Sequence, residues 1–86
     1  GEPMTTEVRI MADEAKRLKN DTAFKSFLTV VREDQVRIFS NSLAPDAGVR
    51  EEAHAILRAL NQIEMQLDAA ISAEVFLDRK LKGAAP

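Results

Sequence analysis

One uninterrupted helical pattern in the second half of the chain restricts its possible folds more than any other feature. Apolar residues recur at alternating spacings of four and three, as in a helix with a single packing seam. A helix from Ala47 to Lys82 has 36 residues and would rise by about 54 Å, whereas a globule of this chain length has a radius of gyration of about 12 Å. Such a helix needs packing partners along its length. The seam residues are Ala53, Ile56, Leu60, Ile63, Leu67, Ala70, Leu77 and Leu81, with Glu74 as the polar member.

Two shorter segments, 6–19 and 22–40, also repeat apolar residues with the helical period. The stretch Asn41–Gly48 predicts a loop, because Pro45 disfavours helical geometry at the residue before it. A connection this short joins antiparallel helices. We therefore expect an all-α fold of two to three helices, dominated by a long antiparallel helical hairpin with a coiled-coil-like seam. The expected organisation is an expression-tag remnant at 1–3 and a single helical domain at 4–86, with helices over about 6–19, 22–40 and 47–82.

Individual residues mark two of the helix boundaries. Gly83 follows Arg79, Lys80 and Lys82, and a glycine after a basic last turn predicts the end of a helix. Asn20 and Asp21 predict either a break between two helices or a kink within one, and the sequence leaves both open.

Composition restricts the chemistry available to the chain. Cysteine is absent and His54 is the only histidine, which argues against disulfides, thiolate nucleophiles and zinc sites. The 12 basic and 14 acidic residues give a net charge of −2, so the cationic excess that drives nonspecific binding to nucleic acid or membranes is missing. We expect no enzymatic activity, no cofactor and no metal. Without an apolar run of about 18 residues or a secretory signal pattern, we expect a cytoplasmic protein that does not bind membranes.

The end of the third helix carries more apolar residues than one seam can bury. From Ala69 to Leu77 the helix is apolar nearly all round, apart from Ser72 and Glu74. A chain this small gains stability from oligomerisation. We therefore expect an oligomer or partner interface here, although a first helix folded over the same surface within a monomer is an equal alternative. The predicted interface residues, which we call the end surface, are Ile71, Val75, Phe76 and Leu77.

Charged residues suggest three further surfaces. His54, in the stretch Ala53–Arg58, invites a phosphotransfer role, although the heptad pattern places it toward solvent as an ordinary surface histidine. The acidic stripe is solvated surface, a docking site for a basic partner or a set of paired carboxylates for acid–base chemistry; it consists of Glu64, Asp68, Glu74 and Asp78. A candidate basic patch would allow weak DNA binding; its members are Lys16, Arg17, Lys19, Lys25, Arg32 and Arg37.

The stretch Ala15–Phe24, the segment Val49–Glu52 and the seam from Ile56 to Leu67 together resemble a known group. They are similar to short helical proteins encoded by tailed phages and prophages in head-assembly and DNA-packaging gene groups. The hairpin also resembles the oligomerisation core of small terminase subunits, without their separate helix-turn-helix domain.

This resemblance implies a non-enzymatic accessory protein in the host-cell cytoplasm. It would act as a homo-oligomer that docks to a phage packaging or head protein, with DNA a weak further partner. Two alternatives stay open. The first is a monomeric adaptor or inhibitor that binds a host protein, and the second is a histidine phosphotransfer module that uses His54.

Overall fold

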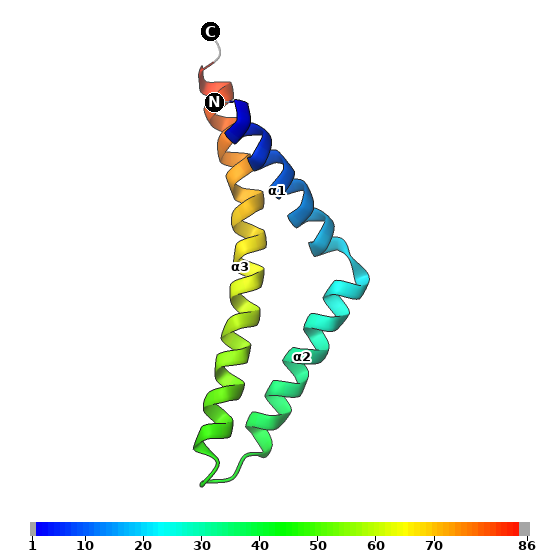
Figure 1. Ribbon diagram of the computed structural model, residues 1–86, viewed down its shortest axis with the longest axis vertical. Coiled ribbons are helices and arrows are strands. Elements are labelled where there is room, and N and C mark those ends of the chain that lie inside the picture. Colours follow the sequence, from blue (N-terminus) through cyan, green and yellow to red (C-terminus); the bar gives the residue numbers. More distant parts are fainter. Residues whose placement is uncertain (1, 85–86) are drawn as a thin grey trace. The chain divides into compact units, whose positions relative to one another are not determined.

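The computed structural model describes residues 2–84, and these residues form three α-helices and no strand (Figure 1). The helices are α1 (Glu2–Asn20), α2 (Thr22–Asn41) and α3 (Ala47–Ala84). The predicted all-α fold is therefore confirmed, with three helices. Residue contacts divide the chain into two compact units. Unit 1 comprises Gly1–Asp21 and Met65–Pro86, and unit 2 comprises Thr22–Glu64, so that each unit contains one part of α3.

Unit 1 pairs α1 with the C-terminal part of α3. The two helices run antiparallel, since Arg9 contacts Asp78 whereas Lys19 contacts Asp68. The buried apolar side chains of α1 are small: Ala12 is 0% exposed and Ala15 is 3% exposed. Alanines at a helix contact allow the backbones to approach closely, but they contribute little apolar area.

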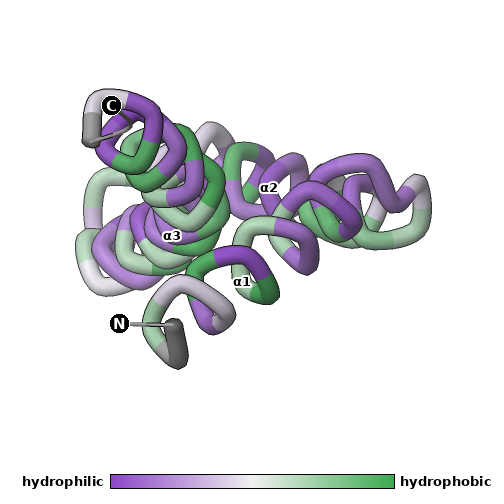
Figure 2. Tube along the Cα trace, turned by 90° about the horizontal axis from the view of Figure 1, so that it is seen from above, coloured by the Kyte–Doolittle hydropathy of each residue, from purple (hydrophilic) through white to green (hydrophobic). Residues whose placement is uncertain are grey.

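Unit 2 is the predicted antiparallel hairpin, formed by α2 and the N-terminal part of α3 (Figure 1). Its buried side chains, Ala53 and Leu60, both belong to α3. No residue of α2 is buried. In Figure 2, hydrophobic and hydrophilic residues alternate along each helix, which is the pattern of helices that bury one stripe and leave the remainder exposed.

The turn between α2 and α3 is fixed by two charged side chains. A carboxylate oxygen of Asp46 accepts a hydrogen bond from the Leu43 backbone N–H at 2.8 Å. The Arg50 guanidinium donates to the Leu43 carbonyl at 2.6 Å, to the Ala44 carbonyl at 3.3 Å and to Ser42 Oγ at 3.1 Å. These bonds satisfy backbone carbonyls that follow α2 and hold the chain at the point where it reverses.

Asn20 and Asp21 separate two helices rather than kinking one. The Asn20 side-chain amide donates to the Lys16 carbonyl at 2.8 Å, and the Asp21 N–H donates to the Leu18 carbonyl at 3.1 Å. The Leu18 carbonyl belongs to the last turn of α1, where no intrahelical N–H is left to pair with it. Asp21 itself is non-helical, and α2 begins at Thr22.

Both outer helix ends differ from the prediction. α1 begins at Glu2 instead of about Thr6, because a proline such as Pro3 fits the first turn of a helix, where its missing N–H costs no bond. It therefore extends into the expected tag remnant, of which Gly1 lies outside the described residues. α3 continues through Gly83 to Ala84, and neither Gly48 nor Gly83 has a positive φ. Gly83 ends a helix only in the left-handed conformation, which it does not adopt here.

The seam of α3 is covered unevenly. Ala53 and Leu60 are buried and Ile56, Leu67, Ala70 and Leu77 are half-buried, but Ile63 is 43% exposed and Leu81 is 49% exposed. Among the described residues, no helix combines the length and the apolar character that crossing a membrane requires.

Candidate functional site

The end surface of α3 is half covered. Ile71 and Leu77 are half-buried in unit 1, where α1 is the helix opposite them. Val75 is 47% exposed and Phe76 is 72% exposed. The first helix therefore covers part of this surface, at Ile71 and Leu77. Val75 and Phe76 remain accessible to another molecule.

The acidic stripe is engaged in ion pairs within the chain. In unit 1, the Glu74 carboxylate accepts hydrogen bonds from Arg9 Nη1 at 3.4 Å and Lys16 Nζ at 2.7 Å. Arg9 Nη2 also donates to Asp78 at 2.8 Å. The two remaining pairs are Lys19 with Asp68 in unit 1 and Arg32 with Glu64 in unit 2.

The ion pairs of Glu74 and Asp78 raise the pKa values of Arg9 and Lys16. Hydrogen bonding and charge attraction from Asp78, with a smaller contribution from Glu74, raise the pKa of Arg9. The hydrogen bond to Glu74 raises the pKa of Lys16 above its ordinary value of 10.5. Glu74 is the central acceptor of this cluster, since its side chain is only 13% exposed and binds two cations. α1 is thus held on α3 by charge as well as by its alanines.

The candidate basic patch is largely neutralised by carboxylates. Besides the pairs of Lys16, Lys19 and Arg32, Arg17 contacts Glu14 at 2.9 Å and Arg37 contacts Asp34 at 2.8 Å. Lys25 is the one member without an ion pair in the part of the chain that the structure describes. The six residues are also divided between the two units. Paired cations offer less attraction to phosphate than free ones, so this patch gives little support to DNA binding.

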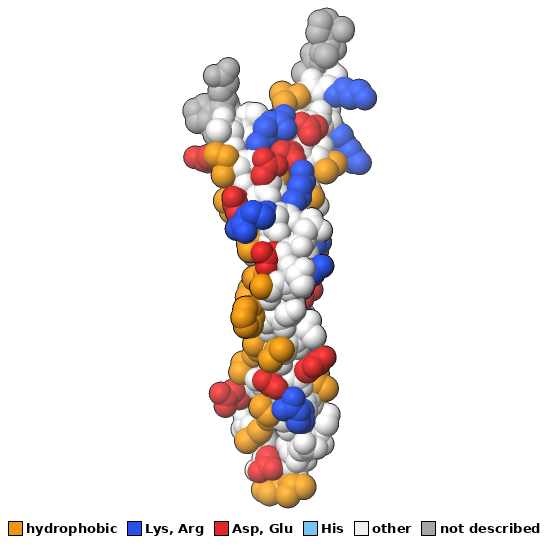
Figure 3. Space-filling view, turned by 90° about the vertical axis from the view of Figure 1, so that its right-hand side faces the viewer, with side chains coloured by type: hydrophobic (Ala, Val, Ile, Leu, Met, Phe, Trp, Pro, Cys, Tyr) orange, Lys and Arg blue, Asp and Glu red, His pale blue; other side chains and the backbone are white. Residues whose placement is uncertain are grey.

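The exposed apolar residues of α2 form a surface that the sequence interpretation did not single out. Six large apolar side chains of this 20-residue helix are exposed. In the lower part of Figure 3, hydrophobic side chains gather along the left edge of the view. A sequence signal for this surface exists, since segment 22–40 carries large apolar residues on both flanks of its helical stripe. The exposed residues are Phe27, Val30, Val31, Val36, Ile38 and Phe39.

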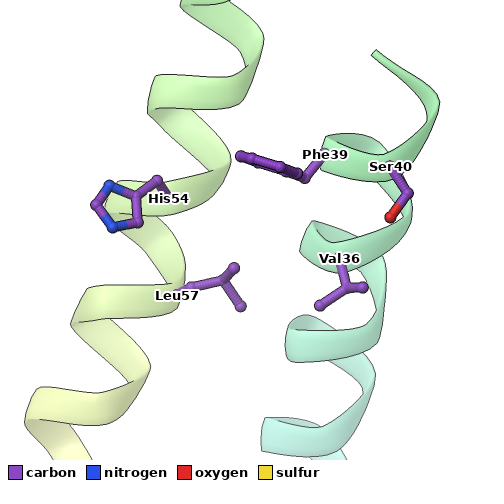
Figure 4. A pocket seen from close by; sticks show the side chains of 5 residues that line it. All are labelled: Val36, Phe39, Ser40, His54 and Leu57. Atoms are coloured by element: carbon purple, nitrogen blue, oxygen red, sulfur yellow. The ribbon is translucent and has the colours of Figure 1, made fainter.

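His54 is exposed on α3, which confirms its predicted solvent-facing position. It borders a hollow of about 240 Å³ that is also lined by Val36, Phe39, Ser40 and Leu57. In Figure 4, the Phe39 ring extends from α2 toward α3 and Val36 faces Leu57, whereas the imidazole points away from α2. This hollow is walled mainly by apolar side chains, and a neighbouring hollow of about 390 Å³ is lined by Phe39, Ala47, Arg50, Glu51 and His54.

Within the described residues, no group of histidine and carboxylate side chains is placed to hold a metal ion. The features that the structure brings together are therefore ion pairs between helices and exposed apolar stripes. Comparison with known proteins finds no matching family model, no matching curated protein and no matching solved structure.

Proposed function

We propose that this chain is a non-enzymatic phage-type assembly or DNA-packaging accessory protein of the small-terminase kind, which acts by self-association and by docking to a partner. The observation that carries the proposal is the exposure of large apolar side chains on both units. Phe27 of unit 2 and Phe76 of unit 1 are each 72% exposed. Exposed apolar side chains that cluster along a helix typically mark protein–protein contacts.

A pair of helices cannot bury more than one stripe of each helix. In unit 2 that stripe is covered only in part, because no residue of α2 is buried. When another chain covers the apolar residues outside the stripe, the complex is stabilised by about 25 cal/mol for each Å² of apolar surface removed from water. This is the expected behaviour of an assembly protein rather than of a chain that acts alone.

The link to phage packaging rests on the resemblance of Ala15–Ala70 to helical proteins of those gene groups. In such a setting each subunit would contribute a weak docking surface for a packaging or head protein. Self-association would then raise the effective concentration of these surfaces at the partner. Since most of the candidate basic patch is ion-paired, docking to protein is favoured over direct DNA binding.

The alternative functions receive less support. An adaptor that offered its acidic stripe to a basic host protein would first have to break ion pairs, because all four carboxylates already contact cations. The phosphotransfer alternative depends on His54 alone, and a phosphorylation assay of the chain against His54→Gln separates it from the proposal.

The test is light scattering coupled to size-exclusion chromatography, at two protein concentrations and two salt concentrations. We expect a stable mass several times the 9.5 kDa of the chain. We also expect the packaging-motor subunit of the phage that encodes the chain to co-elute with it. A monomer under all conditions would overturn the proposal in favour of the adaptor class. Stable oligomers that bind no packaging or head protein would reject the packaging role while leaving self-association in place.

A further inference from the structure

We propose that a second copy of this chain packs against one flank of α2, so that two copies of unit 2 form a four-helix arrangement. This inference rests on the self-association in the proposed function and assigns the surface that mediates it. We call this flank the outer stripe; it consists of Phe27, Val30, Val31 and Ile38. The prediction from the sequence had placed the interface on the end surface of α3 instead.

α2 has two adjacent stripes of mostly apolar residues, of which α3 covers one. Phe24, Leu28 and the polar Gln35 are half-buried in unit 2 and form the inner stripe. In the outer stripe, Phe27 is 72% exposed, Val30 54%, Val31 38% and Ile38 40%. Phe27, Val31 and Ile38 follow one another at spacings of four and seven, so they lie on one face of the helix.

The Arg32–Glu64 ion pair shows which flank of unit 2 carries the outer stripe. It marks one side of the two-helix pair. Successive residues of a helix are rotated by about 100°. Relative to the covered line of α2 through Phe24 and Leu28, Arg32 therefore lies on one flank and Val31 on the other. By the same rotation, Glu64 and Ile63 lie on opposite flanks of the covered line of α3 through Ala53 and Leu60.

Both helices therefore contribute to one apolar surface. On α3, Ile63 is 43% exposed although it belongs to the heptad seam. It lies on the same side of unit 2 as the outer stripe, opposite the Arg32–Glu64 pair. A surface built from two helices is the kind that a second helical hairpin can cover.

The chain exposes 6654 Å², against roughly 5,000 Å² for a compact folded monomer of this mass. A standard protein–protein interface buries about 800 Å² on each partner. The excess belongs to the chain as a whole, and the outer stripe is one place where large apolar side chains contribute to it.

The small core explains why the partner is a second copy. The buried apolar side chains of the described residues are three alanines and Leu60. A chain of this size with so little burial needs a further apolar contact whenever it is folded. A second copy meets that requirement, because it is present wherever the chain itself is present.

The charges of the outer stripe allow this self-pairing. Two identical surfaces related by a two-fold axis bring equal charges together, so a strongly charged stripe would repel its own copy. Asp34 is the one charged residue on this face of the helix, between Val31 and Ile38. Its carboxylate is paired with Arg37 at 2.8 Å, which reduces the repulsion between two copies.

The first experiment compares Phe27→Asp with Phe76→Asp. Both phenylalanines are 72% exposed, but Phe27 lies in the outer stripe of unit 2 and Phe76 lies in the end surface of unit 1. We expect Phe27→Asp to reduce the light-scattering mass to that of the monomer while helix content by circular dichroism is kept, and Phe76→Asp to leave the mass unchanged. The reverse result would overturn the inference and place the interface on the end surface, while self-association and the proposed function would stand.

A second experiment does not depend on a charged substitution. Because the chain contains no cysteine, Val31→Cys and Thr29→Cys each introduce one thiol. Both residues are exposed on α2, but Thr29 lies outside the outer stripe. Treatment with a short bismaleimide should cross-link Val31→Cys into dimers at concentrations where Thr29→Cys stays monomeric on a denaturing gel.

Equal cross-linking of both cysteine variants would contradict a specific stripe contact, and so would a chain that is monomeric by light scattering. If the stripe mediates dimers that bind no packaging or head protein, the inference holds and the packaging role fails.

Discussion

The two units of this chain differ in how many ion pairs join their helices. In unit 1 the contact between α1 and α3 combines two buried alanines and half-buried apolar residues with Arg9, Lys16 and Lys19, whose partners are carboxylates of α3. In unit 2 the contact depends on Leu60, Ala53 and half-buried apolar residues, with Arg32–Glu64 as the ion pair between the helices. α3 thus binds both α1 and α2 by apolar packing, but several ion pairs are added only in unit 1.

Because of this difference, the two units should respond differently to salt. Ion pairs between exposed side chains weaken in salt, because the Debye length falls to about 3 Å at 1 M. Apolar contacts do not weaken in this way. Perturbations of charge should therefore affect unit 1 more strongly than unit 2, whereas perturbations of side-chain volume should affect both.

Truncating the apolar core should have the largest effect. Leu60 is 6% exposed, and replacing a buried leucine by alanine costs about 2–5 kcal/mol. Leu60→Ala should lower the midpoint of urea unfolding followed by circular dichroism. The control is Met65→Ala on the same helix, where the side chain is 60% exposed and a change within about 0.5 kcal/mol is expected. Equal losses for the two variants would show that unit 2 has no apolar core of its own.

The turn of unit 2 comes second. Arg50→Lys keeps the charge but removes the planar guanidinium that bonds the Leu43 and Ala44 carbonyls and Ser42. The expected loss is about 1–2 kcal/mol, measured by the same urea titration. Arg58→Lys, at an exposed position of α3, should leave the midpoint unchanged. If both substitutions are neutral, the turn does not depend on this network.

Removing the central carboxylate of unit 1 should have a smaller and local effect. Glu74→Gln takes away the charge that binds Arg9 and Lys16, so amide hydrogen exchange should become faster in α1 and stay unchanged in α2. Addition of 1 M salt to the unsubstituted chain should produce the same selective change. Equal acceleration of exchange in α1 and α2 would show that the ion pairs of Glu74 do not act on unit 1 alone.

The smallest effect should follow from alkaline pH. The hydrogen bond to Glu74 raises the pKa of Lys16 above its ordinary value of 10.5. Its stabilising contribution is therefore fully present below the ordinary pKa and is lost as pH rises through the raised one. Exchange of α1 should accelerate in that range, and Lys16→Arg should reduce the acceleration because arginine keeps its proton. An identical pH profile for both chains would assign the change to other groups.

Local sequence signals locate the two interruptions between the helices, although they leave open whether Asn20–Asp21 is a break or a kink and do not give the outer helix ends. Pro45 and the Asn20–Asp21 pair mark the two interruptions, and the starts of α2 at Thr22 and α3 at Ala47 agree with the prediction. These signals act within a few residues of the backbone that they change, so they can be recognised without knowledge of the tertiary structure.

The contacts between helices could not be derived in the same way. The heptad pattern treats Ile63 and Leu60 as equivalent, yet Ile63 lies one residue from the end of unit 2 and is 43% exposed. The carboxylates of the acidic stripe were interpreted as solvated or as docking residues because their cations lie far away in the sequence. Glu74, for example, pairs with Lys16, 58 residues earlier. Such pairs depend on which helix covers which face, and one sequence does not specify this.

The alanines at the helix contacts have an evolutionary consequence. Ala12, Ala15 and Ala53 are each at most 3% exposed, so a larger side chain at any of them would push two helices apart, at a cost of about 1–3 kcal/mol. Selection should therefore preserve small size rather than hydrophobicity at these three sites. In natural variants of this chain we expect alanine, glycine or serine there, while neighbouring leucines and isoleucines exchange freely with one another.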